Sequence, residues 1–308
     1  MNILISDNWL RDYLKTTATP ESLAKLLSLS GPSVEKVTKV GKDTVYSIEI
    51  TTNRIDIAGV YGIAREASAI LPTSKIKAKL LPLRFKSHQS FVSSVDYLKA
   101  SVDSSLCSRF TAVLVKNVKM APSPEWMKER LSAVGIRPLN NVVDISNYIM
   151  RELGQPVHTF DYDKISGHKM TLRASIKGEA ITTLDGKAHK LPGGDIVIED
   201  GEGRLIDLAG IMGGENSAIE EGSKNVLLFV QTYNPASIRR TSMSLSQRTE
   251  AAEIFEKGLD PELVSAGIRR GIDLFEELTA GKAEGKILYI YPNPVKVKSV
   301  SVKLEFIN

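Results

Sequence analysis

The sequence has a single cysteine, no long apolar run and only a small excess of positive charge, and each scarcity narrows the class of protein. The one cysteine among 308 residues, Cys107, leaves no partner for a disulfide within the chain, which fits a reducing cytoplasm. The same count excludes a zinc site made of four cysteines, or of two cysteines and two histidines. No apolar stretch approaches the roughly 18 residues of a membrane span. We therefore expect a cytoplasmic protein without membrane contact.

The charge balance is nearly even, with 40 Lys and Arg against 36 Asp and Glu and a net charge of +4. A dedicated nucleic-acid-binding protein usually has a denser basic face, so the composition permits an RNA partner without indicating one. The hydrophobic fraction of 42% and the charged fraction of 25% are typical of a globular protein. The length is sufficient for two domains.

Residues 1–82 are predicted to form a small N-terminal domain of helices and strands. Thr19 and Pro20 are typical of a helix start, and Gly31 of its end. The alternation in 44–51 predicts a strand. A second helix follows at about 60–71, with Asp56 as its expected cap. The Lys-, Ser- and Pro-rich stretch 72–90 indicates a connector.

Residues 83–285 are predicted to form a second, larger domain. A strand at 109–120, a helix from Ser123-Pro124 and a helix at 140–153 come first. Asp185-Gly186 then marks a hairpin turn, and strands follow at 195–200, 204–210 and 225–231. Asn234-Pro235 and Asp260-Pro261 open two further helices. This order predicts an α+β fold with a mixed, mainly antiparallel sheet packed with helices.

Residues 286–308 are expected to leave that domain. They contain a predicted strand, a linker with two prolines and a second predicted strand at the end of the chain. We interpret them as a linker and the first strand of a following, truncated domain.

Three polar residues are candidates for a binding or catalytic pocket. His158 lies in a turn between apolar neighbours, where a histidine can accept or relay a proton or make a purely structural hydrogen bond. Glu215 follows two glycines, whose small size lets a carboxylate point into a cleft, although a solvent-facing turn is the simpler alternative. Asn147 shares a helix face with apolar residues and needs hydrogen-bond partners, either in a neighbouring loop or in a substrate or water.

Arg239, Arg240 and Arg248 form a cluster that could bind a phosphate of an RNA terminus. Ion pairs with Glu250 or Glu253 are the alternative. The sequence contains no HExxH, no CxxC and no nucleotide-binding loop. Residue chemistry alone therefore indicates a hydrolytic or recognition pocket built from His, Glu and Asn in an α+β domain.

Several segments together carry a family resemblance, and they occur in one order along the chain: ISDNWLRDYL (5–14), SIEITTNRIDIAGVYGIAREASAIL (47–71), VVDISNY (142–148), ELGQPVHTFD (152–161), AGIMGGEN (209–216), NVLLF (225–229) and RTEAAEIFEKGLDP (248–261). This set resembles the N-terminal part of the bacterial phenylalanyl-tRNA synthetase beta subunit, with the last five segments in its editing module. The resemblance covers nearly the whole chain.

The resemblance implies a function within phenylalanine-tRNA ligase, which charges tRNA for protein synthesis. The editing module of that family hydrolyses misacylated Tyr-tRNA(Phe). Matched motif by motif, the implied catalytic residues are His158, Asn147 and Glu215, with Glu215 as the acceptor for the tyrosine hydroxyl. The residues implied around the substrate are Gly213, Gly214, Thr249 and Ala251. A non-catalytic, tRNA-binding scaffold with a decayed pocket is the alternative.

The resemblance also implies the partners and cofactors. The expected partners are tRNA(Phe), free tyrosine or phenylalanine, and the alpha subunit in an assembly of two alpha and two beta subunits. No cofactor or metal is expected on this segment, whereas ATP and Mg²⁺ serve the complete synthetase.

Two departures from the family pattern concern the tRNA. The stretch from Val37 to Asp43 leaves no room for the usual tRNA-binding OB-fold insert. Ile254 and Lys257 stand where arginines are common, which would weaken contact with the tRNA end.

Overall fold

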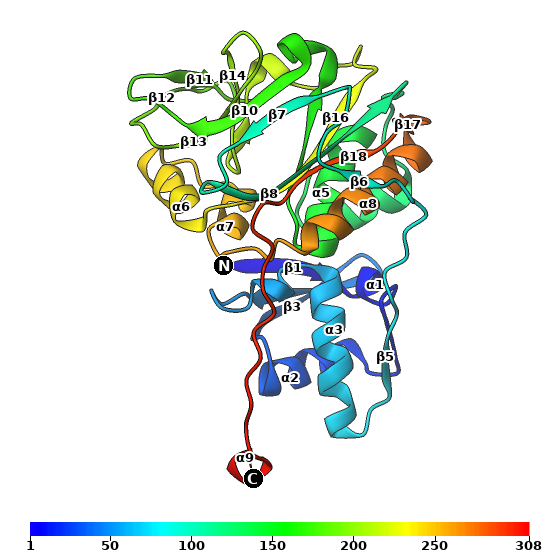
Figure 1. The fold of residues 1–308 in the computed structure, drawn as a ribbon. Coiled ribbons are helices and arrows are strands. Elements are labelled where there is room, and N and C mark those ends of the chain that lie inside the picture. The colour runs from blue at the N-terminus through cyan, green and yellow to red at the C-terminus, as the bar shows by residue number, and fades with distance from the viewer. Residues whose placement is uncertain (308) are drawn as a thin grey trace.

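The computed structural model describes residues 1–307 and shows a small N-terminal unit below a larger body with two β-sheets (Figure 1). In the N-terminal unit, β1, β4 and β3 form an antiparallel sheet in that order, and β2 pairs with β5. Its elements are β1 (Asn2–Ser6), α1 (Asp7–Leu10), β2 (Leu14–Thr16), α2 (Pro20–Ser30), β3 (Val34–Val40), β4 (Asp43–Glu49), α3 (Val60–Ile70) and β5 (Ala78–Leu80).

Local capping explains the helix limits in this unit. The Thr19 hydroxyl accepts a hydrogen bond from the backbone N–H of Ser22, and α2 ends at Gly31, as predicted. The expected cap of α3 was wrong. Gly59 precedes that helix, whereas Asp56 lies in a separate short turn and pairs with Arg54 and Arg65. The Asp56 carboxylate is thus engaged in ion pairs and does not cap the helix.

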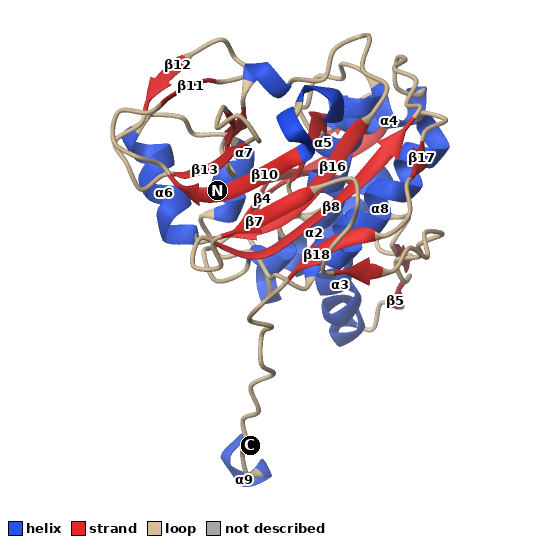
Figure 2. Cartoon of the chain, turned by 45° about the horizontal axis from the view of Figure 1, so that its top comes forward, coloured by secondary structure: helices blue, strands red, loops and turns tan. Residues whose placement is uncertain are grey.

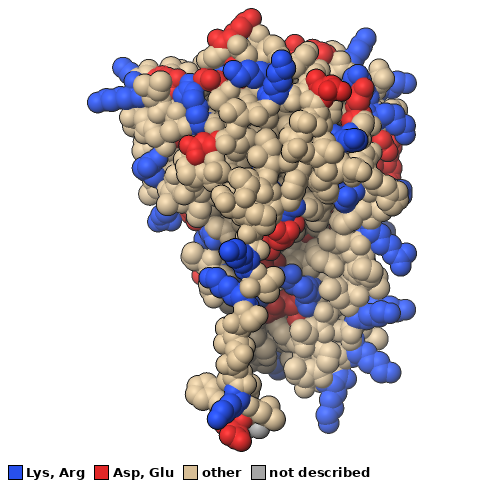
Figure 3. Space-filling model, in the orientation of Figure 1, with Lys and Arg blue, Asp and Glu red and all other residues tan. Residues whose placement is uncertain are grey.

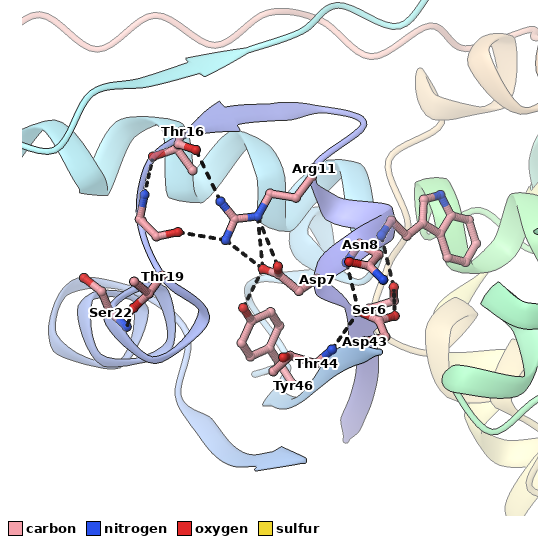
Figure 4. Close-up of polar contacts among 12 residues, drawn as sticks. Ser6, Asp7, Asn8, Arg11, Thr16, Thr19, Ser22, Asp43, Thr44 and Tyr46 are labelled. Atoms are coloured by element: carbon pink, nitrogen blue, oxygen red, sulfur yellow. Dashed lines mark hydrogen bonds and ion pairs between the residues drawn. The ribbon is translucent and has the colours of Figure 1, made fainter. Parts of the chain in front are cut away.

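A polar network around Asp7 joins the elements of the N-terminal unit (Figure 4). The Tyr46 hydroxyl donates to the Asp7 carboxylate at 2.6 Å, and Arg11 pairs with the same carboxylate at 3.0 Å. Arg11 also donates to the backbone carbonyls of Thr16 and Ala18. The first helix is therefore fixed both to β4 and to the loop that leads into α2.

The larger body contains a six-stranded sheet and a five-stranded sheet. The first has the order β6-β18-β8-β16-β9, with β17 also paired to β8, and the second has the order β15-β14-β13-β10-β7. Most pairings are antiparallel, with β10–β7 and β18–β6 parallel. The elements are β6 (Phe91–Val92), β7 (Lys99–Val102), β8 (Cys107–Lys116), α4 (Glu125–Ala133), α5 (Asn141–Leu153), β9 (Val157–Asp161), β10 (Lys169–Ala174), β11 (Ala180–Thr182), β12 (Ala188–Lys190), β13 (Ile196–Glu199), β14 (Leu205–Leu208), β15 (Met212–Gly213), β16 (Val226–Tyr233), α6 (Pro235–Ser244), α7 (Glu250–Phe255), α8 (Leu263–Leu278), β17 (Lys282–Ala283) and β18 (Ile287–Ile290).

Side-chain alternation along β16 divides the interior into two cores. Leu228 and Val230 pack in the core that includes α5, α8 and the N-terminal unit, whereas Leu227 and Phe229 pack in the core shared with the five-stranded sheet. Because successive strand residues face opposite sides, one strand serves both cores. Figure 2 shows α5 and α8 beside the strands β8 and β16. The predicted α+β class is confirmed.

The N-terminal unit packs against α5 through a hydrogen bond to a buried carboxylate and a close backbone approach. Glu152, fully buried, accepts from Arg270 at 2.7 and 2.9 Å and from the Tyr13 hydroxyl at 2.5 Å. A Cβ on Gly59 would lie 2.4 Å from the backbone nitrogen of Gly154. This helix therefore links the N-terminal unit to the segment that carries His158.

The hairpin at Asp185-Gly186 is confirmed, since β11 and β12 pair antiparallel around it. The last part of the chain differs from expectation in two elements, because residues 287–290 were expected to lie outside the larger domain and they lie within its sheet. β18 pairs with β8 inside the central sheet, and an extended segment then leads away from the body (Figure 1). Residues Leu304–Ile307 form a short helix, α9, where a strand was predicted. Their side chains are exposed, so no sheet neighbour supplies the hydrogen bonds that a strand requires.

Candidate functional site

A small pocket lies where the two sheets of the larger body face each other. Its volume is about 60 Å³, room for about two water molecules. The six-stranded sheet contributes β9 and β16, the five-stranded sheet contributes β14 and β15, and α7 supplies the remaining wall. The lining residues are Pro156, Val157, His158, Asp207, Gly210, Ile211, Met212, Gly213, Gln231, Ala251 and Phe255.

His158 and Gly213 meet across this pocket. His158 lies on β9 opposite Phe229 of β16, and its ring contacts Phe160 edge-on at 4.4 Å. A Cβ on Gly213 would lie 2.6 Å from both Cε1 and Nε2 of His158, well inside van der Waals contact. The glycine is thus required for the imidazole to occupy this position.

The environment of His158 keeps its imidazole neutral. Burial lowers its pKa from 6.5 to about 4, and no charged group contributes to the shift. At pH 7 the ring therefore has one N–H donor and one nitrogen acceptor. A group with this pKa is a weak base, so it is better suited to orient a water molecule or an ester than to take up a full proton.

Ala251 and Thr249 have different relations to the pocket. Ala251 lies in the first turn of α7 and lines the pocket. The Thr249 hydroxyl caps α7 by accepting from the backbone N–H of Ala252, and it donates to the carbonyl of Ile211 at 2.9 Å. Thr249 therefore positions the helix that carries Ala251 against the loop after β14.

The other predicted residues lie outside the lining of this pocket. Glu215 is exposed in a short turn and lines a separate depression beside Arg204 and Asn216. Asn147 is half-buried in the middle of α5. Gly214 packs against β14, and a Cβ at this position would lie 2.8 Å from the carbonyl oxygen of Ile206. The structure brings together His158, Gly213 and Ala251, and the expectation that Glu215 and Asn147 share their cleft is not met.

Three buried polar residues at the site were missed by the sequence analysis: Asp207, Gln231 and Tyr233. Among residues 1–307, Gln231 Oε1 and the Tyr233 hydroxyl have no hydrogen-bond partner within 3.5 Å, although the neighbouring Gln231 side chain lowers the pKa of Tyr233, which burial raises. Burial raises the pKa of Asp207 well above its ordinary value, with no other cause. One feature of the sequence could have indicated Asp207 and Gln231: each lies within an otherwise apolar strand. A polar side chain buried in such a strand needs a hydrogen-bond partner.

Two of the three clustered arginines form internal ion pairs, and the third, Arg240, donates to the backbone carbonyl of Gly194. Arg248 contacts Glu256 at 2.5 Å and Glu253 at 3.6 Å, and Arg239 contacts Glu256 at 3.4 Å. Glu250 pairs instead with Arg151. Figure 3 shows basic and acidic side chains interspersed over one face of the molecule, which agrees with the nearly even charge balance.

Ile254 lies in the core between the sheets at 1% exposure. An arginine at this position would have to bury its charge or displace α7. In this chain Ile254 therefore contributes to the core, and its effect on contact with the tRNA end stays a prediction.

Neither a membrane span nor a metal cluster is found among residues 1–307. None of the helices there is long and apolar enough to cross a membrane. No group of three or more His, Cys, Asp or Glu side chains in the same range is arranged to hold a metal ion.

Residues 106–280, which include the whole pocket lining, match the family model of the B3/4 domain. The chain belongs to the B3/4 domain family. It is similar to the phenylalanine-tRNA ligase beta subunits of Geobacter metallireducens, at 39% identity over 273 residues, and of Clostridium tetani, at 39% over 280 residues. These matches cover 87% and 88% of this chain but 33% and 35% of the relatives. The chain thus spans about a third of their length.

A solved structure is also similar to the chain, an N-terminal fragment of the phenylalanyl-tRNA synthetase beta subunit from Pyrococcus horikoshii. It is 14% identical, with a TM-score of 0.48, and the match covers 100% of this chain and 83% of that fragment.

Proposed function

We propose that this chain is part of a phenylalanine-tRNA ligase beta subunit and that its pocket hydrolyses the ester bond of misacylated Tyr-tRNA(Phe). The main observation is the contact of His158 with Gly213 in a pocket between two sheets. The similarity to phenylalanine-tRNA ligase beta subunits supports the choice of substrate. The synthetic reaction, with ATP and Mg²⁺, belongs to the alpha subunit of the complete enzyme. We place this chain with tRNA(Phe) and that subunit in a two-alpha, two-beta assembly.

A separate hydrolytic site is needed because the synthetic site has limited selectivity for phenylalanine over tyrosine. An apolar pocket shaped for phenylalanine rejects an analogue with one added hydroxyl by only about 10²-fold. A second pocket that binds the hydroxyl can discriminate by about 10⁴-fold or more, because phenylalanine would leave its polar groups unpaired.

The proposed reaction uses water as nucleophile. A water oxygen bonds to the ester carbonyl carbon, and the bond to the ribose oxygen of the terminal nucleotide then breaks. The water gives up one proton, the ribose oxygen gains one, and the products are tyrosine and free tRNA. His158 accepts a hydrogen bond from the attacking water and holds it near the carbonyl. Because its pKa lies at about 4, its contribution is mainly positional.

Deacylation of Tyr-tRNA(Phe) by the complete ligase that contains this chain tests the proposal. His158→Ala should slow the reaction by about ten- to a hundredfold, at the lower limit of general acid–base effects. The wild-type rate should show no step near pH 6.5 attributable to His158. The exposed His88 provides the matched control, since His88→Ala should leave the rate unchanged.

Gly213→Ala provides a second variant for the same assay. The added methyl group would displace the imidazole without removing it, so the rate should fall while the aminoacylation rate is retained. A wild-type rate equal to spontaneous hydrolysis, unchanged in both variants, would contradict the proposal. The non-catalytic scaffold would then be the better description of this domain.

A further inference from the structure

The tip of the β11–β12 hairpin, residues 183–187, lies against one side of the pocket. The backbone N–H of Leu184 donates to the carbonyl of Gly213 at 3.0 Å. A Cβ on Gly213 would lie 3.2 Å from Leu184 Cδ1 and 2.6 Å from the His158 ring. The Leu184 side chain and the imidazole are therefore close neighbours, although the hairpin and β9 are separate segments of the chain.

A side-chain hydrogen bond joins the hairpin tip to the segment before α7. Gln247 Nε2 donates to Asp185 Oδ2 at 3.0 Å, and the same nitrogen lies 3.7 Å from the sulfur of Met212, a residue that lines the pocket. Gln247 is 6% exposed, and two hydrogen bonds of 2.9 Å fix its backbone to Ser242. Gln247 is thus firmly held beside the pocket, and the tip is attached to it.

The tip is exposed, whereas the strands behind it are anchored in the core between the sheets. Ile181 and Leu191 are buried in that core. By contrast, Leu184 is 48% exposed and residues 185–187 are exposed. The hydroxyl and the backbone N–H of Thr183 both donate within the turn, which keeps the turn together as a unit. A segment with so few buried contacts opens locally at low cost in free energy.

The pocket is too small for the ligand of the proposed function, so one of its sides must yield. Its volume of about 60 Å³ is below the roughly 300 Å³ of typical ligand pockets. The sides formed by β9, β14 and β16 belong to the two sheets, and moving them would break the backbone pairing of those strands. Displacing the hairpin tip breaks only the Leu184 and Asp185 bonds to the body.

We propose that residues 184–187 form a gate to this pocket. Leu184 leaves its place beside His158 when an aminoacyl group enters, and the hydrogen bond from Gln247 to Asp185 is the latch that holds the gate closed over the empty pocket. The inference rests on the proposed editing function. A ligand that binds only the open form has an apparent dissociation constant equal to the intrinsic one divided by the open fraction. A weaker latch should therefore improve binding.

Amide hydrogen exchange of the 308-residue chain, measured by NMR, tests the latch without a substrate. Gln247→Leu removes the donor and keeps a side chain of similar size. The Leu184 N–H should then exchange about two- to tenfold faster, which is the shift in open population that one hydrogen bond gives. The Gly214 N–H, which donates to the Ile206 carbonyl, should keep its rate, because only the tip opens.

Deacylation of Tyr-tRNA(Phe) by the complete ligase tests the gate as the entrance. Gln247→Leu should lower KM by the factor by which the exchange rate rises and leave kcat unchanged, because the latch is already broken in the bound state. Leu184→Ala also weakens the closed form and should lower KM. Ile176→Ala is the matched control, since Ile176 is an apolar residue of the same domain at 68% exposure outside the tip, and it should change neither constant. Thermal melting should establish that each variant is folded.

An unchanged exchange rate at Leu184 in folded Gln247→Leu would overturn the gate and leave the editing proposal standing. Faster exchange with an unchanged KM would also overturn it, because the tip would then move without admitting the substrate. A wild-type deacylation rate equal to the spontaneous one would overturn the editing proposal and, with it, the role of the tip as an entrance. The exchange measurement, which needs no substrate, distinguishes that failure from a failure of the latch.

Discussion

At the scale of single residues, the pocket holds two titratable groups that burial drives to the neutral state. Burial lowers the pKa of His158 to about 4 and raises that of Asp207 well above its ordinary value. Burial thus favours the uncharged form of both groups, and at pH 7 the His158 ring is neutral.

The two groups have opposite effects on stability as the pH changes. An unfolded Asp207 ionises at about pH 4, whereas the folded carboxyl retains its proton at higher pH. The folded state then binds more protons, so the free energy of unfolding falls as the pH rises above about 4, by about 1.4 kcal/mol per unit. For His158 the unfolded state binds more protons between about pH 4 and pH 6.5, so this group makes stability rise with pH in that window.

Asp207→Asn should therefore raise the melting temperature at pH 7, because asparagine needs no proton to be neutral. The gain should shrink as the pH is lowered toward 4, where the wild-type carboxyl is protonated in both states. Thermal unfolding of both proteins at several pH values between 4.5 and 8 measures this difference. His158 is common to both proteins and cancels. A gain that did not vary with pH would show that the carboxyl is ionised in the folded state.

At the scale of elements, α5 connects the N-terminal unit to the pocket. Its last turn carries Glu152, which pairs with Arg270, and the chain then passes through Gly154 directly to β9 and His158. Gly154 adopts φ +75°, which ends the helix in the left-handed conformation that favours glycine. A shift of α3 against this turn would therefore be transmitted to the strand that holds the imidazole.

Gly59→Ala tests this connection. Its Cβ would lie 2.4 Å from the Gly154 nitrogen and 2.7 Å from the Leu153 carbonyl carbon. Both are backbone atoms that no side-chain rotation can relieve, so we expect a loss of about 1–3 kcal/mol in the free energy of unfolding. Chemical denaturation measures it. Gly222→Ala is the control, because nothing lies within 4 Å of that position, and equal stabilities for the two variants would contradict the close packing.

At the scale of the whole molecule, the N-terminal unit and the larger body share one continuous core. It contains Trp9 and Ile48 from the first unit together with Tyr148 and Ile272 from the second. The two segments on either side of the predicted boundary near residue 82 thus bury their apolar side chains in the same core. Cooperative unfolding of the two parts is the physical consequence.

The two tryptophans of the chain provide a probe for this cooperativity. Trp9 stacks on Tyr148 at 4.3 Å, and Trp126 contacts the same ring at 5.4 Å, so tryptophan fluorescence reports the junction between the parts. We expect its thermal transition to coincide with that of far-ultraviolet circular dichroism, which reports all helices and strands. A fluorescence transition that came clearly earlier would show that the N-terminal unit separates before the sheets unfold.

The sequence by itself determined the fold class, most elements and three residues that line one pocket. Caps such as Thr19 and the turn at Asp185-Gly186 act within a few residues, so they can be recognised without the rest of the chain. His158, Gly213 and Ala251 followed from ordered motifs, and the structure places all three on one pocket.

Tertiary structure alone decided what surrounds the pocket and which polar residues face it. Glu215 and Gly213 are two residues apart, but the turn that begins after Gly214 directs Glu215 to a separate depression. Asp207 and Gln231 lie in no recognisable motif. They became candidates only because the two sheets that carry them face each other in the fold. Burial and the absence of a partner depend on residues far away in the chain, so neither pattern nor spacing could have revealed them.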